Sequence, residues 1–140
     1  MDQIWADMLV AEYAAVADGK LTLVGAGFDW FTSGGPVTFG VGVLIHVPWS
    51  ETNTPHSWRF QLADEDGHPF ATPDGSPLQF GDRFEIGRPP GIPTGAPLTV
   101  PLAFNLQGLM FPPQSRHVAQ LYLDERTTPL VEAGFAVLGS

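Results

Sequence analysis

Apolar residues recur at every second position over several stretches of the chain, which is the period of β-strands with one buried face. The longest such stretch is residues 37–47, whose apolar face consists of Val37, Phe39, Val41, Val43, Ile45 and Val47. Residues 57–66 repeat the pattern with Trp58, Phe60 and Leu62 on one side. We therefore predict a strand in each stretch, with these residues facing the core.

Two glycines, Gly40 and Gly42, lie on the opposite face of the predicted 37–47 strand. Glycine weakens the interior of a strand unless another part of the molecule approaches its backbone closely. We therefore expect a loop or a large aromatic side chain to cover this face.

The N-terminal third predicts a β-hairpin, with an apolar run at 8–16 and a second run at 21–31. Between them lie Asp18 and Gly19, which tolerate the positive φ angles of two-residue hairpin turns. The alanines of the first run also suit a helix, but the β-branched residues of the second run commit the returning arm to a strand.

The chain also ends in a predicted hairpin, in which the segments 117–125 and 130–138 are joined by a turn at 126–129. The residues available to the core are Val118, Leu121 or Leu123, Phe135 and Val137.

The segments 78–87 and 98–106 complete the predicted strands. The first has Phe80 and Phe84 as candidate inward residues. Pro101 lies inside the second and cannot donate a ladder hydrogen bond, which indicates an edge strand or a bulge. The proline-rich connector between these two segments is expected to be a rigid, extended crossover from one sheet to the other.

These patterns predict an all-β protein: a single β-sandwich domain over residues 1–140 with about eight strands, immunoglobulin-like or jelly-roll-like. The composition supports this prediction, because 16 glycines and 14 prolines in 140 residues provide many tight turns. The hydrophobic fraction of 44% is that of an ordinary globular chain.

The charge of the chain argues against two classes of partner. The formal net charge is −9 and Lys20 is the only lysine, so phosphate backbones and anionic membrane surfaces are repelled. The chain has no cysteine, and its N-terminus lacks the basic residues of a signal peptide. We expect no nucleic-acid or membrane partner, and a cytoplasmic protein or part of an intracellularly assembled particle.

The segment 47–67 contains the first candidate site. A possible ligand-binding set in it is Trp49, Asn53, His56 and Trp58. Trp30 is a further aromatic that could stack on a ligand. A tryptophan at a strand end more often covers the core, however, and a loop rich in Ser, Thr and Asn forms turns with its own backbone. The structural interpretation is favoured.

Motifs for catalysis or for a bound ion are weak. The run Asp64-Glu65-Asp66-Gly67 resembles part of a calcium loop, but no acidic residue closes the pattern. The four histidines lie on different predicted elements without metal-ligand spacing. No nucleophile motif or phosphate-binding loop is present. We therefore name no catalytic residue, metal site or cofactor, and we favour a protein that is not an enzyme.

The segment 106–117 is more apolar than a connecting loop usually is. If its large residues cannot all be buried, they form a protein-contact surface, and the candidates are Leu106, Leu109, Met110 and Phe111. We therefore favour a non-catalytic protein-interaction or assembly module with a protein partner or a homo-oligomeric state. The alternatives are a small-ligand or carbohydrate-binding sandwich and, less favoured, a hydrolase with dispersed His and acidic residues.

The order of several motifs resembles a known family. The motifs are ADGKLTLVGAGFDWF, VPWSETNTPHSWRFQLADEDG, FEIGRPPGIPTGAPLTVPLAFNL and the closing pair HVAQLYLDE and LVEAGFAVL. Together they resemble a family of small uncharacterised bacterial proteins classed as a domain of unknown function. The resemblance implies a standalone β-sandwich, and it carries over no activity, cofactor or catalytic residue.

Overall fold

Ten β-strands are found in the computed structural model, within the residues it describes, 3–32 and 34–139. The strands are β1 (Trp5–Ala11), β2 (Tyr13–Ala17), β3 (Lys20–Val24), β4 (Trp30–Thr32), β5 (Val37–Val47), β6 (His56–Asp64), β7 (Gln79–Phe84), β8 (Leu98–Leu109), β9 (Ser115–Leu123) and β10 (Val131–Leu138). A 3-10 helix, η1 (Trp49–Glu51), follows β5. The sequence TSGGP at residues 32–36 favours a turn, and its Ser33 lies outside the described residues.

The strands exceed the predicted eight because two predicted strands are each divided. The chain bends at Glu12 between β1 and β2, and the second run is interrupted between β3 and β4. Gly25 and Gly27 lie in that interruption with φ angles of 62° and 86°, which L side chains rarely adopt. The N-terminal region therefore contains four short strands.

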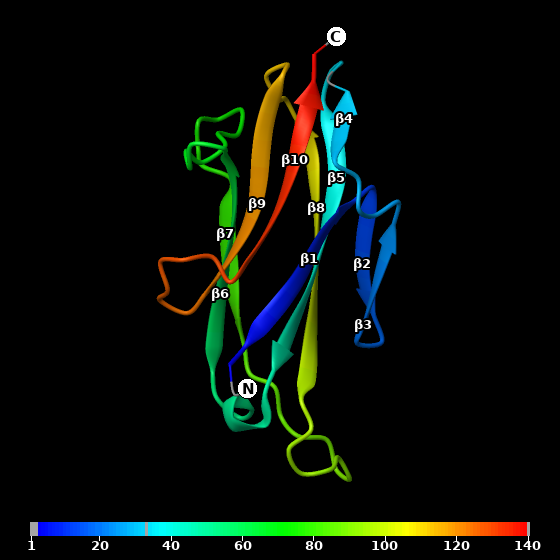
Figure 1. Ribbon diagram of the computed structural model, residues 1–140, viewed down its shortest axis with the longest axis vertical. Coiled ribbons are helices and arrows are strands. Elements are labelled where there is room, and N and C mark those ends of the chain that lie inside the picture. Colours follow the sequence, from blue (N-terminus) through cyan, green and yellow to red (C-terminus); the bar gives the residue numbers. More distant parts are fainter. Residues whose placement is uncertain (1–2, 33, 140) are drawn as a thin grey trace.

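The strands form two sheets that pack face to face (Figure 1), together with a separate hairpin. One sheet has the order β1-β5-β8, and the other has the order β4-β10-β9-β6-β7. All pairs are antiparallel except β4 with β10. Aromatic contacts join the sheets, such as Phe39 on β5 to Phe135 on β10, with ring centroids 5.2 Å apart. The predicted all-β sandwich is confirmed.

The alternation of β5 and β6 is confirmed in the core. The inward side chains of β5 from Phe39 to Val47 are at most 2% exposed, and Trp58, Phe60 and Leu62 of β6 are also buried. Phe84 is half-buried against this core, whereas Phe80 on the edge strand β7 is 37% exposed.

The parity predicted for the C-terminal hairpin is wrong at one residue. Both Leu121 and Leu123 are buried, and Ala119 and His117 continue their face of β9. Val118 therefore belongs to the opposite face of β9, outside the buried core. Phe135 and Val137 are in the core as predicted.

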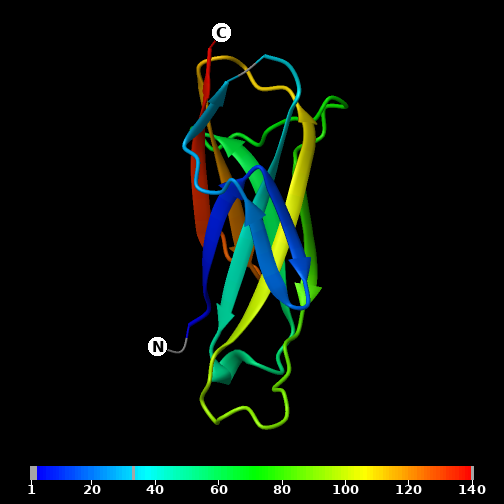
Figure 2. The same cartoon turned by 90° about the vertical axis from the view of Figure 1, so that its right-hand side faces the viewer.

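The hairpin β2–β3 covers the outer face of the three-stranded sheet, as Figure 2 shows. A methyl group added at Gly42 would lie within 2.5 Å of Leu23 Cδ2, and one added at Gly40 would lie 2.7 Å from the Ala14 nitrogen. The expected close cover over these glycines is confirmed, but the cover is the hairpin rather than a loop or a large aromatic.

One side chain ties the hairpin to the sheet. Asn105 on β8 accepts a hydrogen bond from the Ala14 N–H at Oδ1 (3.0 Å) and donates from Nδ2 to the Ala14 carbonyl (2.8 Å). The amide thereby pairs with the β2 backbone as a neighbouring strand would. This contact holds β2 against β8.

The connector from β7 to β8 joins the two sheets, as predicted, and β8 with its Pro101 is an edge strand of its sheet. No helix in the described part of the chain has the length and hydropathy needed to cross a membrane.

We expect Asn105→Ala to loosen the hairpin without unfolding the sandwich, because Ala14 loses both partners. Loss of these bonds corresponds to about 1–2 kcal/mol in local opening, or roughly tenfold faster amide exchange at Ala14. The measurement is amide hydrogen exchange by NMR, with Gln107→Ala on the same strand as the control. Unchanged protection of Ala14 in Asn105→Ala would contradict this assignment.

Candidate functional site

The predicted ligand-binding loop makes contacts with other residues of the chain. Arg88 lies over the Trp49 ring, 3.7 Å from its centroid, and donates to the Trp49 carbonyl (2.8 Å) and to Thr52 Oγ1 (2.7 Å). Asn53 is exposed with a φ of 58°, and its N–H donates to the Ile86 carbonyl. These contacts fasten the loop after β5 to the start of the proline-rich crossover.

His56 and Trp58 are both buried on β6. The Nδ1 of His56 lies 3.2 Å from Asp124 Oδ2, its Nε2 lies 3.2 Å from the Glu51 carbonyl, and its ring stacks on Phe84. Trp58 packs against Phe104. The structure thus brings Trp49, Asn53, His56 and Trp58 to one end of β6, where their contacts favour a structural role.

Asp124 fixes this end of the sandwich through its carboxylate. Its Oδ1 accepts from the Ser57 N–H at 2.9 Å, and its Oδ2 contacts His56. Burial opposes the ionisation of Asp124, but the bonds from Ser57 and His56 outweigh it and lower the pKa of its carboxyl below the ordinary value of 3.8. The ionised carboxylate therefore stabilises the folded protein.

The predicted protein-contact residues divide into core and surface. Leu106, Leu109 and Phe111 are buried, with exposed fractions of 4–7%, and only Met110 is exposed, at 58%. Phe111 lies among Phe39, Phe70 and Phe135. The segment is apolar because most of it completes the core, so three of the four predicted contact residues are not exposed to a partner.

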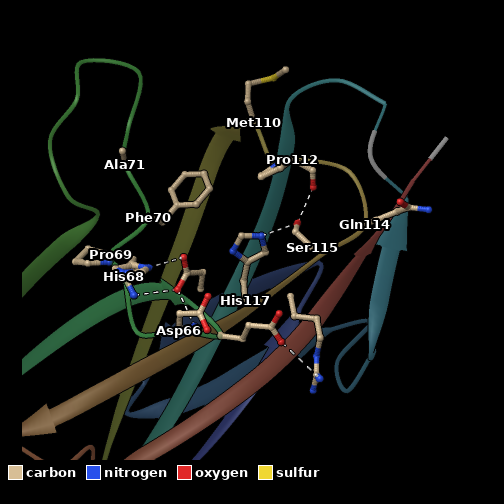
Figure 3. Close-up of a pocket in the computed structure, with 13 residues that line it drawn as sticks. Asp66, His68, Pro69, Phe70, Ala71, Met110, Pro112, Gln114, Ser115 and His117 are labelled. Atoms are coloured by element: carbon tan, nitrogen blue, oxygen red, sulfur yellow. Dashed lines mark hydrogen bonds and ion pairs between the residues drawn. The ribbon is translucent and has the colours of Figure 1, made fainter.

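A pocket of about 470 Å³ lies at the end of the sandwich where β6 ends and β9 begins (Figure 3). One wall is the turn that follows β6, and the other is the start of β9 with the preceding loop. Asp64 and His117 are directly paired across β6 and β9, so their side chains lie on the same, inward face. Exposed Met110 lies at the rim.

His117 is the most unusual residue of the pocket. Its ring is only 6% exposed and is packed against Phe70, Phe111 and Phe135. Its Nδ1 is the buried side-chain polar atom that has no hydrogen-bond partner among the described residues. Burial lowers the pKa of His117, although the carboxylates of Asp64 and Glu65 act in the opposite direction. The ring is therefore held neutral.

The tautomer of His117 follows from its other nitrogen. Ser115 Oγ lies 2.6 Å from the Pro112 carbonyl and 2.8 Å from His117 Nε2. A carbonyl only accepts, so the single hydroxyl hydrogen goes to Pro112, and Nε2–H must donate to Ser115 Oγ. Nδ1 is therefore left with a bare lone pair.

The turn after β6 gathers polar groups on the other wall. Asp64 Oδ1 accepts from the N–H groups of Asp66 and His68, both at 2.9 Å, and Oδ2 lies 3.3 Å from His68 Nδ1. The bond from the His68 backbone is the main reason that the pKa of Asp64 is lowered. An exposed ion pair, Arg116 with Glu65 at 3.8 Å, flanks the turn.

The Ser115–His117 contact is not arranged as an activated nucleophile. A nucleophilic serine gives its hydrogen to the base, but here that hydrogen goes to Pro112 and Nε2 carries a hydrogen of its own. What the pocket offers chemically is a bare imidazole nitrogen beside carboxylates.

The sequence indicates Val118 as available to the core and His117 only as one of four separate histidines, whereas the structure buries His117. The signal was present: His117 shares its parity with the buried residues Ala119, Leu121 and Leu123. A histidine on an otherwise apolar strand face marks a buried imidazole. Its proximity to Asp64 depends on the register of β6 with β9, which local pattern does not give.

A second surface feature lies on the outer face of the three-stranded sheet, the face that points away from the core. A shallow groove of about 270 Å³ runs between β1, β5 and the hairpin, with Leu9, Leu21, Leu23 and Leu44 among its lining residues. Trp5 stacks on His46 beside it, with centroids 3.9 Å apart, and His46 also contacts Asp7 at 2.8 Å. This face is predominantly apolar.

A family model described as "Family of unknown function (DUF6941)" matches residues 6–132, nearly the whole chain. No curated protein matches the chain.

We expect Asp124→Ala to destabilise the protein at neutral pH by about 1 kcal/mol, because Ser57 and His56 lose a partly exposed charged acceptor. The folded-state pKa of Asp124 is lowered, so its contribution is present above 3.8 and disappears as the pH falls through the folded-state value. Urea unfolding at pH 7, 5 and 3 should show the difference between the two proteins shrinking towards pH 3. The exposed neighbour Glu125→Ala is the control, and a difference that grows on acidification would contradict the assignment.

Proposed function

The chain belongs to this family of unknown function, and we propose that it acts as a non-catalytic protein-interaction module. The observation that carries the proposal is the distribution of exposed large hydrophobic residues. Of nine in the described residues, five lie between positions 5 and 24: Trp5, Leu9, Tyr13, Val16 and Val24. Contiguous exposed apolar surface on a folded domain is characteristic of binding surfaces.

These residues and the neighbouring groove form what we call the N-terminal face: β1, the hairpin β2–β3 and the outer side of β5. Trp5 and Leu9 point outwards from β1, and the groove adjoins Leu9. Tryptophan and tyrosine are enriched where binding energy is concentrated. The N-terminal face therefore replaces the segment 106–111 as the contact surface that we propose.

The charge around the N-terminal face indicates what kind of partner would bind there. The exposed ionisable residues around the N-terminal face include Asp7, Glu12 and Asp18, against the single lysine Lys20. Each chain also carries a net charge of −9, so two copies repel one another. We propose a different protein whose docking surface has apolar residues at its centre and basic residues at its rim.

The topology supports a finer description of the fold. If β1, β5 and β8 are lettered A, B and E, and β6, β7, β9 and β10 are lettered C, C′, F and G, the sheets read A-B-E and G-F-C-C′. This is the strand order of immunoglobulin-like sandwiches, and a buried tryptophan on strand C, here Trp58, accompanies it. We infer an immunoglobulin-like sandwich with the hairpin and β4 inserted between A and B. Fold alone assigns no function.

The small-ligand alternative is supported by a different observation. Trp30 is 56% exposed and lines a pocket of about 580 Å³ together with Phe28, Phe31 and Phe39. Aromatic faces at a pocket mouth suit an apolar ligand or a sugar ring. This pocket, rather than the loop at Trp49, is where a stacking ligand would bind.

The interaction proposal predicts that Trp5→Ser with Leu9→Ser abolishes association while the fold is kept, because both side chains are exposed. The native, untagged protein is purified, its co-purifying proteins are identified by mass spectrometry, and its assembly mass is measured by light scattering. A stoichiometric partner should be lost from the double variant but retained by Met110→Ser, which removes an exposed apolar residue elsewhere. Binding should weaken as salt is added.

Two results would count against this proposal. A partnerless monomer would remove it, and association that persists in the double variant would place the contact elsewhere. If the chain forms homo-oligomers that Trp5→Ser disrupts, the N-terminal face is the contact surface, but its partner is a second copy of the chain rather than a basic protein.

The ligand alternative predicts that thermal-shift screening of sugars and small aromatic compounds finds a stabilising compound whose effect disappears in Trp30→Ala. Trp49→Ala serves as the matched tryptophan control, since Trp49 is covered by Arg88. Loss of the shift in Trp49→Ala but not in Trp30→Ala would return the site to the loop after β5.

A further inference from the structure

We propose that the pocket at the end of β6 and β9 binds a divalent transition-metal ion of the zinc class through Asp64, Asp66, His68 and His117. The sequence has no metal motif, so this inference comes from the folded arrangement alone. It is independent of the N-terminal face and of the function proposed for it.

The first observation is the cluster on the turn. Asp64, Asp66 and His68 each offer a ligand atom, and these three atoms lie within 4.8 Å of one another. The turn backbone fixes this spacing, because Asp64 Oδ1 accepts from the N–H groups of both other residues. Each carboxylate keeps acceptor capacity for a cation. A cluster of this kind is common on protein surfaces, so it does not define a site by itself.

The second and independent observation is His117. It is buried, is not part of the turn, and presents a nitrogen without a partner. Its Nε2–H is anchored by Ser115, which is in turn anchored by the Pro112 carbonyl. Metal-binding histidines have this arrangement: one nitrogen donates to an anchoring group, which fixes the tautomer and leaves the other nitrogen as the ligand. His117 is therefore preorganised as a ligand through Nδ1.

The third observation is the relative position of the two parts. Asp64 and His117 are paired in register on the same face of the sheet, and all four proposed ligands line the same pocket. In Figure 3 the ring nitrogen of His117 that is not bonded to Ser115 lies on the side of His68 and Phe70. The side chain of His68 is 77% exposed, so it can rotate towards Nδ1, while aromatic packing holds the His117 ring in place.

The donor set decides the class of ion. Two imidazoles and two carboxylates match the four-coordinate nitrogen and oxygen sites of zinc. Calcium takes six to eight oxygen ligands and magnesium six, and neither favours imidazole nitrogen. The neighbouring carboxylate of Glu65 adds negative charge that attracts a cation, which Arg116 partly offsets. We therefore expect zinc and cobalt to bind and calcium not to compete.

The test uses the full-length protein, stripped with a chelator and titrated with Zn²⁺ by calorimetry in the presence of excess Ca²⁺. We expect one ion per chain. Long-range proton–nitrogen NMR spectra of the four histidines should show His117 as the Nε2–H tautomer before addition. On adding Zn²⁺, the Nδ1 resonance of His117 and one nitrogen of His68 should shift, while His46 and His56 remain unchanged.

Variants separate the proposed site from surface binding. His68→Gln and His117→Gln should each weaken Zn²⁺ binding at least tenfold, and Ser115→Ala, which removes the positioning contact, should weaken it about tenfold. His46→Gln is the matched control, because it removes another histidine paired with an aspartate and should leave the affinity unchanged.

Three results would overturn the proposal. The first is the absence of stoichiometric Zn²⁺ binding. The second is equal affinity in wild type and His117→Gln, which would indicate adventitious binding by the exposed turn. The third is a His117 Nδ1 resonance that does not respond to Zn²⁺. This last measurement is made on the unaltered protein, so it decides the question even if His117→Gln does not fold.

Discussion

The close approach of the hairpin β2–β3 to β5 is the constraint on which the rest of the structure depends. The inward face of β5 supplies the centre of the sandwich core, and its outward face carries Gly40 and Gly42, where no side chain fits beneath the hairpin. Asn105 completes the contact by pairing with Ala14. Because one side of the hairpin faces β5, the other side, with Tyr13 and Val24, is turned to solvent. The contact that covers the outward face of β5 therefore also sets the solvent side of the hairpin, which is part of the N-terminal face.

Sequence pattern predicts this fold where burial alternates strictly, and fails where it does not. β5 and β6 each bury one face against the core, so their inward residues could be named from period two alone. In the C-terminal hairpin, apolar residues occur on both faces of β9. The prediction that Val118 faces the core therefore takes the outward face for the inward one at this residue. The hydrophobicity of 106–111 could not distinguish a contact surface from core, because that depends on which strands close over it. Phe111 is buried by aromatic residues from distant parts of the chain.

The end pocket was beyond sequence reasoning for the same physical reason. Its turn was visible as an acidic run, and its histidines were visible as single residues. Their meeting depends on the register of β6 with β9, and on the loop that places Ser115 between Pro112 and His117. Long-range register is a property of the packed sandwich, and neither propensity nor local spacing encodes it. Trp49, Trp58 and His56 are conspicuous residue types in the sequence, yet their contacts lie within the fold.

A buried imidazole among phenylalanines needs a physical reason. Phenylalanine at position 117 would fill similar space against Phe70, Phe111 and Phe135 without a polar atom. Leaving a polar nitrogen buried without a partner costs about 1–3 kcal/mol, which the ring recovers only in part through its bond to Ser115. Natural sequences depart from such packing rules mainly at sites of function. An Nδ1 without a hydrogen-bond partner makes His117 a poorer core residue than phenylalanine would be. The same nitrogen, held in one tautomer beside the carboxylates of the turn after β6, is well suited to binding a cation.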